Sequence, residues 1–275
     1  MRVQVIDLFC GVGGFTEGAL NAGAEVVLAI DNDIVKVKQH KLNHPNGRCI
    51  ALHLGGCLND MKKLLSFYII RRKGVHFHLH MSPPCQAISN ASWSVEKGEG
   101  YDMINWCLDL VDIVKPDSWS LENVLPLQKF LTRHSIPFEK VNALDYGVPQ
   151  SRRRVFAGEG WKLSPTHIGN HQTVAGSLPD LKGEFIASPS MEKRWKNLSI
   201  ERYIPTITSQ SISQIRIGYL GEKRTLKIKE LVTLQGYPDL VFDSKCSTRE
   251  IREMIGNLVC PPIAKSLIEG ITGVE

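Results

Sequence analysis

Two short segments carry side chains suited to nucleophilic chemistry. Cys85 follows Pro83 and Pro84 at the end of the alternating run HFHLHMS, and Glu122 lies near the end of the run SWSLENV. A thiolate is a strong nucleophile, and the pKa of a thiol falls where a helix N-terminus or a cation lies close. A neighbouring carboxyl group can hold or donate a proton at the reacting atoms. Cys85 is therefore a candidate nucleophile and Glu122 a candidate acid, although a free cysteine is more often a small buried residue and Glu122 could be a helix cap or a salt-bridge partner.

A basic element follows further along the chain. Gln150, Arg152 and Arg154 alternate within the run QSRRR. A basic run is usually a solvated face, but guanidinium groups also bind phosphates and the polar edges of bases. We therefore treat these three residues as candidates for substrate contact.

A glycine-rich turn near the N-terminus suits a cofactor. The segment CGVGG at residues 10–14 follows an apolar run, and Asp31 ends a second apolar run about 20 residues later. Small residues let the backbone approach a ligand, and an acid at this distance can accept hydrogen bonds from two ribose hydroxyls. A tight strand-to-helix turn would explain the glycines alone, but together with Asp31 they favour a nucleoside-containing cofactor.

The elements that must position these residues alternate along the chain. Apolar runs predict strands over residues 1–9, 24–33, 76–82 and 118–124, and helical periodicity predicts helices over 15–22, 34–43, 59–70 and 103–114. This alternation predicts an α/β fold, Rossmann-like, with a mostly parallel sheet and helices on both faces. Ligands of such sheets bind at the carboxyl ends of the strands, where Asp31, Cys85 and Glu122 are expected.

The regular pattern weakens after Phe156. Residues 1–156 are expected to form the cofactor-binding catalytic domain, and residues 157–215 a small, loop-rich region. Residues 216–275 show helical periodicity over 226–235, 248–256 and 262–271, and we expect this segment to return to the catalytic domain.

The composition is that of an ordinary globular protein. Of the 275 residues, 43% are hydrophobic and 22% are charged, and the net charge of +5 mildly favours a polyanionic partner. No apolar run reaches the roughly 18 residues of a membrane span. We therefore expect no membrane contact and an intracellular protein, in the cytoplasm of a prokaryote or in a nucleus if the source is eukaryotic or viral. The seven cysteines include no C-x-x-C pair and no zinc spacing, so we expect neither a disulfide framework nor a metal.

Taken together, these segments resemble the cytosine-5 DNA methyltransferases over nearly the whole chain, with the motifs in the family's order. The matching segments are DLFCGVGGF, AIDND, SPPCQAIS, LENV, DYGVPQSRRRVF, RYIPT and IGNLVCPPIAKSL. The resemblance implies methyl transfer from S-adenosylmethionine to C5 of a cytosine flipped out of duplex DNA. It also implies a monomer and a target-recognition role for residues 157–215. A restriction endonuclease or a separate specificity chain is left open as a partner.

The resemblance further implies a role for each candidate residue. Cys85 would attack C6 of the cytosine, a protonated Glu122 would hydrogen-bond N3, and Arg152 and Arg154 would hold the cytosine carbonyl and neighbouring phosphates. Cofactor contacts fall on Phe9, Gly11, Gly13, Asp31, Pro84, Asn257 and Val259, and substrate contacts fall on Gln86, Ser89 and Gln150. The polar segment 90–100 is expected to act as a lid over DNA.

Two features depart from the family pattern. The Gly-Asp pair that contacts adenine in the family is replaced by Gly56-Cys57, so Asn59 or Asp60 would have to substitute. The segment that follows Phe156 is also shorter than the family's target-recognition domain, so DNA specificity could be short, relaxed or assisted by another chain. Its basic and aromatic cluster KRWK, at residues 193–196, could contact DNA or form a solvated loop.

Three alternatives follow from these residues. A tRNA methyltransferase could share the body of the enzyme, although the Cys-Phe-Thr tripeptide typical of that group is missing from this sequence. A catalytically silent binding protein is a second alternative, and Gly56-Cys57 is the only feature that favours it. The nucleophile, the acid and the two arginines argue against it, because a silent protein does not need them. A nicotinamide dehydrogenase could share the glycine turn and Asp31, but it has no use for Cys85 together with Glu122.

Overall fold

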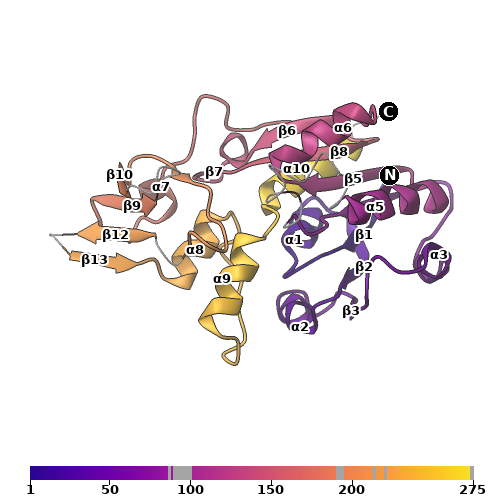
Figure 1. The fold of residues 1–275 in the computed structure, drawn as a ribbon, viewed down its shortest axis with the longest axis horizontal. Helices are drawn as coiled ribbons and strands as arrows, with labels where there is room; N and C mark the ends of the chain where they lie inside the picture. The colour runs from indigo at the N-terminus through magenta and orange to yellow at the C-terminus, as the bar shows by residue number, and fades with distance from the viewer. Residues whose placement is uncertain (86–87, 89–100, 190–194, 213–214, 220–221, 273–275) are drawn as a thin grey trace. The chain divides into compact units, whose positions relative to one another are not determined.

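The computed structural model describes residues 1–85, 88, 101–189, 195–212, 215–219 and 222–272 (Figure 1). Packing divides the chain into two units. Unit 1 consists of Met1–Val141, Arg153–Ser164 and Ala264–Glu275, and unit 2 consists of Asn142–Arg152 and Pro165–Ile263.

Unit 1 begins with the alternation of strands and helices that the sequence predicts. Its first elements are β1 (Arg2–Leu8), α1 (Gly14–Asn21), β2 (Glu25–Asp31), α2 (Ile34–Asn43), β3 (Cys49–Ala51), α3 (Leu58–Ser66), β4 (Val75–Met81), α5 (Asp102–Val114) and β5 (Ser118–Asn123). The elements η2 (Leu125–Leu127), α6 (Gln128–Arg133), β6 (Phe138–Asn142), β8 (Arg153–Glu159) and α10 (Pro261–Thr272) follow. Asp33 caps α2 by accepting hydrogen bonds from the amides of Val35 and Lys36, which fixes the start of that helix.

A seven-stranded sheet runs through unit 1 in the order β3-β2-β1-β4-β5-β8-β6 (Figure 1). The strands β3, β2, β1, β4 and β5 pair in parallel, whereas β8 pairs antiparallel with β5. The predicted mostly parallel α/β fold is therefore confirmed. Because parallel strands end at the same edge, the segments that follow β1, β2, β4 and β5 lie along one side of this sheet.

One face of the sheet is apolar. Phe77, Leu79 and Met81 alternate along β4 and enter a buried core that also contains residues of α3, α5 and α6. This alternation matches the period of two that a pleated strand imposes on its side chains.

The opposite face of β4 is polar although it is also buried. His78 lies 2.7 Å from the hydroxyl of Ser118 and 2.9 Å from that of Ser120, and His80 lies 2.8 Å from Ser120. The ring of Phe15 in α1 stacks on His80 with the ring centroids 3.4 Å apart. Burial lowers the pKa of His78 to about 3, so this ring is neutral at pH 7.

Unit 2 contains a four-stranded antiparallel sheet in the order β10-β9-β12-β13. Its strands are β9 (Phe185–Pro189), β10 (Trp195–Ser199), β12 (Arg216–Tyr219) and β13 (Glu222–Thr225). The other elements are η3 (Ala143–Tyr146), β7 (Gln150–Ser151), α7 (Val174–Ser177), β11 (Ile204–Pro205), α8 (Ile228–Leu234) and α9 (Thr248–Gly256). The sequence predicts α8 and α9, but it does not predict this sheet. The assignment of functions to residues 1–156, 157–215 and 216–275 stays a prediction.

None of the helices in the described ranges is both long and apolar enough to cross a membrane.

Candidate functional site

The turn after β1 holds three of the residues predicted to bind a cofactor. Phe9, Gly11 and Gly13 have φ angles of 60°, 54° and 94°, all in the left-handed region. Glycine adopts this conformation readily, but a bulky residue such as Phe9 does so at a cost in strain. Strained backbone of this kind concentrates where a chain binds ligands. The turn therefore has the conformation expected of a binding loop.

Asp31 is the last residue of β2 and lies beside this turn. Its side chain accepts hydrogen bonds from the amide of Gly11, at 2.9 Å, and from the amide of Asp33, also at 2.9 Å. Each carboxylate oxygen can accept a second hydrogen bond, so Asp31 can hold the turn and still receive two hydroxyls. This hydrogen-bonding capacity suits the ribose of a nucleoside cofactor, and the role of these residues as cofactor contacts stays a prediction.

Trp106 packs beside this turn, a contact that sequence reasoning missed. Its ring meets that of Phe9 edge to face with the centroids 6.4 Å apart, and its indole N–H donates to the carbonyl of Gly56 at 2.8 Å. Nothing in the helical period of residues 103–114 distinguishes this residue from an ordinary core tryptophan. Cys57 precedes α3 and is exposed, as are Asn59 and Asp60. The predicted substitute for the missing adenine-binding carboxylate therefore stays a prediction.

Cys85 follows β4 on a segment that is tied to both neighbouring strands. The amide of Ser82 donates to the carbonyl of Leu8, and its hydroxyl donates to the carbonyl of Phe9 at 3.0 Å. On the other side, the amide group of Asn123 donates to the carbonyl of Pro83 at 3.0 Å. These bonds hold the half-buried Cys85 and the exposed Pro84 at the carboxyl edge of the sheet. The predicted substrate residues Gln86 and Ser89, and the predicted lid at 90–100, lie outside the described residues.

Glu122 and Arg154 form an ion pair at this same edge. The Nε of Arg154 lies 3.0 Å from Oε1 of Glu122, and the two side chains are only 15% and 12% exposed. The pair is built by the antiparallel register of β5 and β8, in which Glu122 faces Phe156. A charge-assisted hydrogen bond in a sheltered site fixes the carboxyl group in one orientation. The structure thus brings together the predicted acid and one of the two predicted arginines.

Gln150 and Arg152 lie in unit 2, where both are buried and satisfied. The Gln150 side chain accepts from the amide of Ile207 at 2.7 Å and donates to the carbonyl of Leu234 at 3.0 Å. The Arg152 guanidinium donates to three backbone carbonyls at 3.0 to 3.1 Å, those of Ile207, Gly256 and Leu258. These contacts favour a positioning role for both residues, which the basic run alone does not indicate.

The remaining predicted residues also belong to unit 2. Asn257 follows α9 and is exposed, whereas Val259 is buried. Their predicted place beside the cofactor stays a prediction. In the cluster at 193–196, Trp195 and Lys196 begin β10, and the two residues before them lie outside the described part of the chain.

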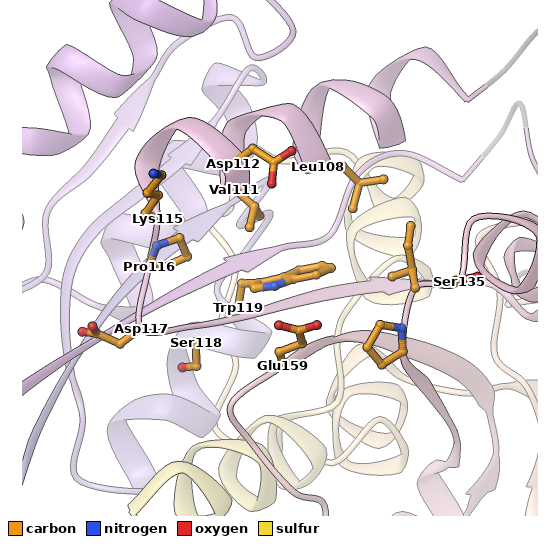
Figure 2. Close-up of a pocket in the computed structure, with 12 residues that line it drawn as sticks. Leu108, Val111, Asp112, Lys115, Pro116, Asp117, Ser118, Trp119, Ser135 and Glu159 are labelled. Atoms are coloured by element: carbon orange, nitrogen blue, oxygen red, sulfur yellow. The ribbon is translucent and has the colours of Figure 1, made fainter.

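A pocket of about 540 Å³ lies at the other edge of the sheet (Figure 2). It is lined by Lys115 at the end of α5, by Trp119 at the start of β5 and by Glu159 at the end of β8. Since Glu122 lies at the opposite end of β5, this pocket is separate from the candidate site.

Comparisons with known proteins indicate the family of this chain. A family model described as C-5 cytosine-specific DNA methylase matches residues 3–158 and 157–273. The Type II methylase M.HgiDII of Herpetosiphon aurantiacus is 22% identical over 339 residues, covering 97% of this chain and 94% of the relative. The Type II methyltransferase M.AgeI of Thalassovita gelatinovora is 26% identical over 210 residues, covering 69% of this chain and 48% of the relative. The chain therefore spans about half the length of this second relative.

Among solved structures, a protein assigned as a DNA modification methyltransferase of an E. coli prophage is similar, with a TM-score of 0.71 and 20% identity. The similarity covers 99% of both chains and concerns the fold.

Proposed function

The chain belongs to the C-5 cytosine-specific DNA methylases, and we propose that it transfers a methyl group from S-adenosylmethionine to C5 of a cytosine in duplex DNA, with Cys85 as the nucleophile. The observation that carries this proposal is the convergence of three features at one edge of the sheet. These features are the strained turn after β1, the tethered Cys85 and the Glu122–Arg154 ion pair.

The residues of the turn suit S-adenosylmethionine. Asp31 would accept hydrogen bonds from the ribose hydroxyls, and Phe9, Gly11 and Gly13 would line the path of the methionine and adenosine groups. Pro84 would lie near the methyl donor, and Asn257 and Val259 would contribute from unit 2. When bound, S-adenosylmethionine supplies an electrophilic methyl group.

Cys85 would begin the reaction with the cytosine flipped out of the duplex. Its thiolate forms a bond to C6, and the electron pair of the C5–C6 double bond moves toward C5 and N3. Glu122, holding a proton at N3, stabilises the charge that develops on the ring. After C5 has accepted the methyl group, its proton leaves to a base, the C5–C6 double bond returns, and Cys85 departs as a thiolate.

The two arginines would act differently in this mechanism. Arg154 pairs with Glu122 and would orient its carboxyl group toward the base while contacting the cytosine carbonyl. Arg152 donates to backbone carbonyls of unit 2 and would position the segment that carries Gln150. Residues 157–215 would recognise the DNA target, and the protein would act as a monomer. The Type II names of the relatives support a restriction endonuclease as its partner in the cell.

The proposal is tested by the transfer of a labelled methyl group to duplex DNA, with tRNA as a parallel substrate. We expect the wild type to label DNA cytosine, and Cys85→Ser to fold but to label nothing. Cys246→Ser is a matched control, because Cys246 is also half-buried but belongs to unit 2 and to none of the predicted motifs. Labelling of tRNA alone would transfer the proposal to RNA. No labelling of either substrate by folded wild type would favour a silent binding protein.

A further inference from the structure

Two cysteines and a histidine that are far apart in the sequence meet inside unit 1. Cys10 lies in the turn after β1, His40 lies in α2, and Cys49 is the first residue of β3. Their exposed fractions are 6%, 1% and 2%. The two sulfurs and a ring nitrogen of His40 all lie within 4.8 Å of one another. The spacing of these residues along the chain matches no zinc motif. The sequence therefore led us to expect no metal, because spacing alone cannot show that the three side chains meet in the fold.

The hydrogen bonds of His40 determine which of its nitrogens can bind a cation. The hydroxyl of Thr16 donates its proton to Asp7 at 2.8 Å and lies 3.1 Å from Nε2 of His40, so with Asp7 deprotonated the hydroxyl accepts from Nε2. Nε2 therefore carries the proton of a neutral ring, and Nδ1 is left with a free lone pair. Nδ1 is buried and has no hydrogen-bond partner among the described residues.

The distance between the sulfurs suits a metal ion. The Sγ atoms of Cys10 and Cys49 are 3.8 Å apart. Two zinc–sulfur bonds of about 2.3 Å at a tetrahedral angle place the sulfurs about 3.8 Å apart. Zinc would also place the ligating nitrogen of His40 about 3.6 Å from each sulfur. In the structure a ring nitrogen of His40 lies within 4.8 Å of both sulfurs. We propose that Cys10, His40 and Cys49 bind a zinc ion, with water as a fourth ligand.

The surroundings of the cluster favour this ion over a purely apolar role for the cysteines. A buried cysteine is commonly a small hydrophobic residue, and Ala29 and Val37 pack beside the two sulfurs as expected for that role. An apolar role leaves the buried lone pair of His40 without a partner, which is unfavourable. Zinc binding releases one proton from each thiol, so the two thiolates neutralise the ion. The relay from His40 through Thr16 to Asp7 is the outer contact that metal-bound histidines usually have.

The ion would join elements that support the candidate cofactor site. It would link the turn after β1 to α2 and to β3, and β3 pairs with the end of β2 that carries Asp31. The inference does not depend on the proposed methyl transfer, because metal binding is measured without substrate.

The test is a titration of the full-length, reduced, metal-free protein with Co²⁺, which takes the place of zinc and shows a charge-transfer band when bound by thiolates. We expect one equivalent of Co²⁺ and this band in the wild type. Cys49→Ala should lose the band, and Cys107→Ala should keep it because Cys107 is buried in unit 1 but in a different core cluster. Thr16→Val should weaken Co²⁺ binding by about 10–100-fold, because it removes the contact that orients His40.

Several results would overturn the inference. They are a wild type without the band, a folded Cys49→Ala that retains it, and a disulfide between Cys10 and Cys49 found by mass spectrometry in protein prepared with reductant. If Cys49→Ala does not fold, Thr16→Val decides the matter, since unchanged affinity in that variant excludes His40 as a ligand.

Discussion

Replacement of Arg152 by methionine is expected to destabilise unit 2 strongly. The guanidinium is 3% exposed and donates to the carbonyls of Ile207, Gly256 and Leu258. A buried carbonyl that loses its donor costs about 1–3 kcal/mol, so three of them set an upper limit of about 9 kcal/mol. Methionine retains much of the packing, and the substitution also removes a buried charge, which offsets part of the loss. We expect the free energy of unfolding to fall by about 3–5 kcal/mol.

Urea denaturation followed by circular dichroism measures this loss, and hydrogen exchange at residues 204–207 and 256–258 locates it. Arg153→Met is the matched control, because Arg153 is adjacent but exposed and should change the stability by no more than about 0.5 kcal/mol. Equal stability of the two variants would refute the argument that Arg152 acts through the three carbonyls. A stable Arg152→Met that no longer methylates DNA would show instead that this arginine contacts the substrate.

Three further predictions concern unit 1. Glu122→Gln should lower methyl transfer about 10²–10³-fold, and it should also lower the melting temperature because the sheltered guanidinium of Arg154 loses its carboxylate; retained activity would remove Glu122 from the mechanism. Gly13→Ala places a Cβ 2.4 Å from Nε2 of His44 at a φ of 94°, so it should lower the free energy of unfolding by about 2–5 kcal/mol. Gly11→Ala has open space around its Cβ and should lower it by only about 1 kcal/mol. Equal losses of stability in thermal denaturation would contradict this difference. Lowering the pH from 6.5 to 4 should destabilise the protein, because the unfolded chain takes up protons at histidines whose pKa burial lowers in the folded state, namely His40, His44, His76, His78 and His80. Asp7, whose pKa burial raises to about 7, acts in the opposite sense but is outnumbered by these histidines, so the free energy of unfolding measured with urea should still fall; a flat profile would contradict buried neutral histidines.

The sequence was sufficient to predict the elements with strong periodicity. The expected helix over 34–43 coincides with α2. The predicted strands that carry Asp31 and Glu122 are also present, with these two residues at their carboxyl ends. β3 escaped prediction because three residues are too few to show a period of two. The strands of unit 2 escaped it because they have at most five residues each and because β9 pairs with β12, which is distant in the sequence.

Parts of the candidate site were also beyond sequence reasoning, for a similar physical reason. A residue type predicts what chemistry a side chain can perform, but its partners depend on chain segments that meet only in the fold. Arg152 has the same type as Arg154, yet one meets backbone carbonyls and the other meets Glu122. Cys10, His40 and Cys49 likewise become neighbours only because β3 pairs with β2.

The polar face of β4 bears on how this sheet finds its own pairing. His78 is opposite Ser118 and His80 is opposite Ser120, while the intervening Leu79 is opposite Trp119. A shift of one residue between β4 and β5 would turn the imidazoles into the apolar core and remove their serine partners. Leucine and valine at these positions would bury more apolar surface, but they would penalise such a shift far less. The histidines and serines therefore give the central strands a folding specificity that hydrophobic burial alone would not provide.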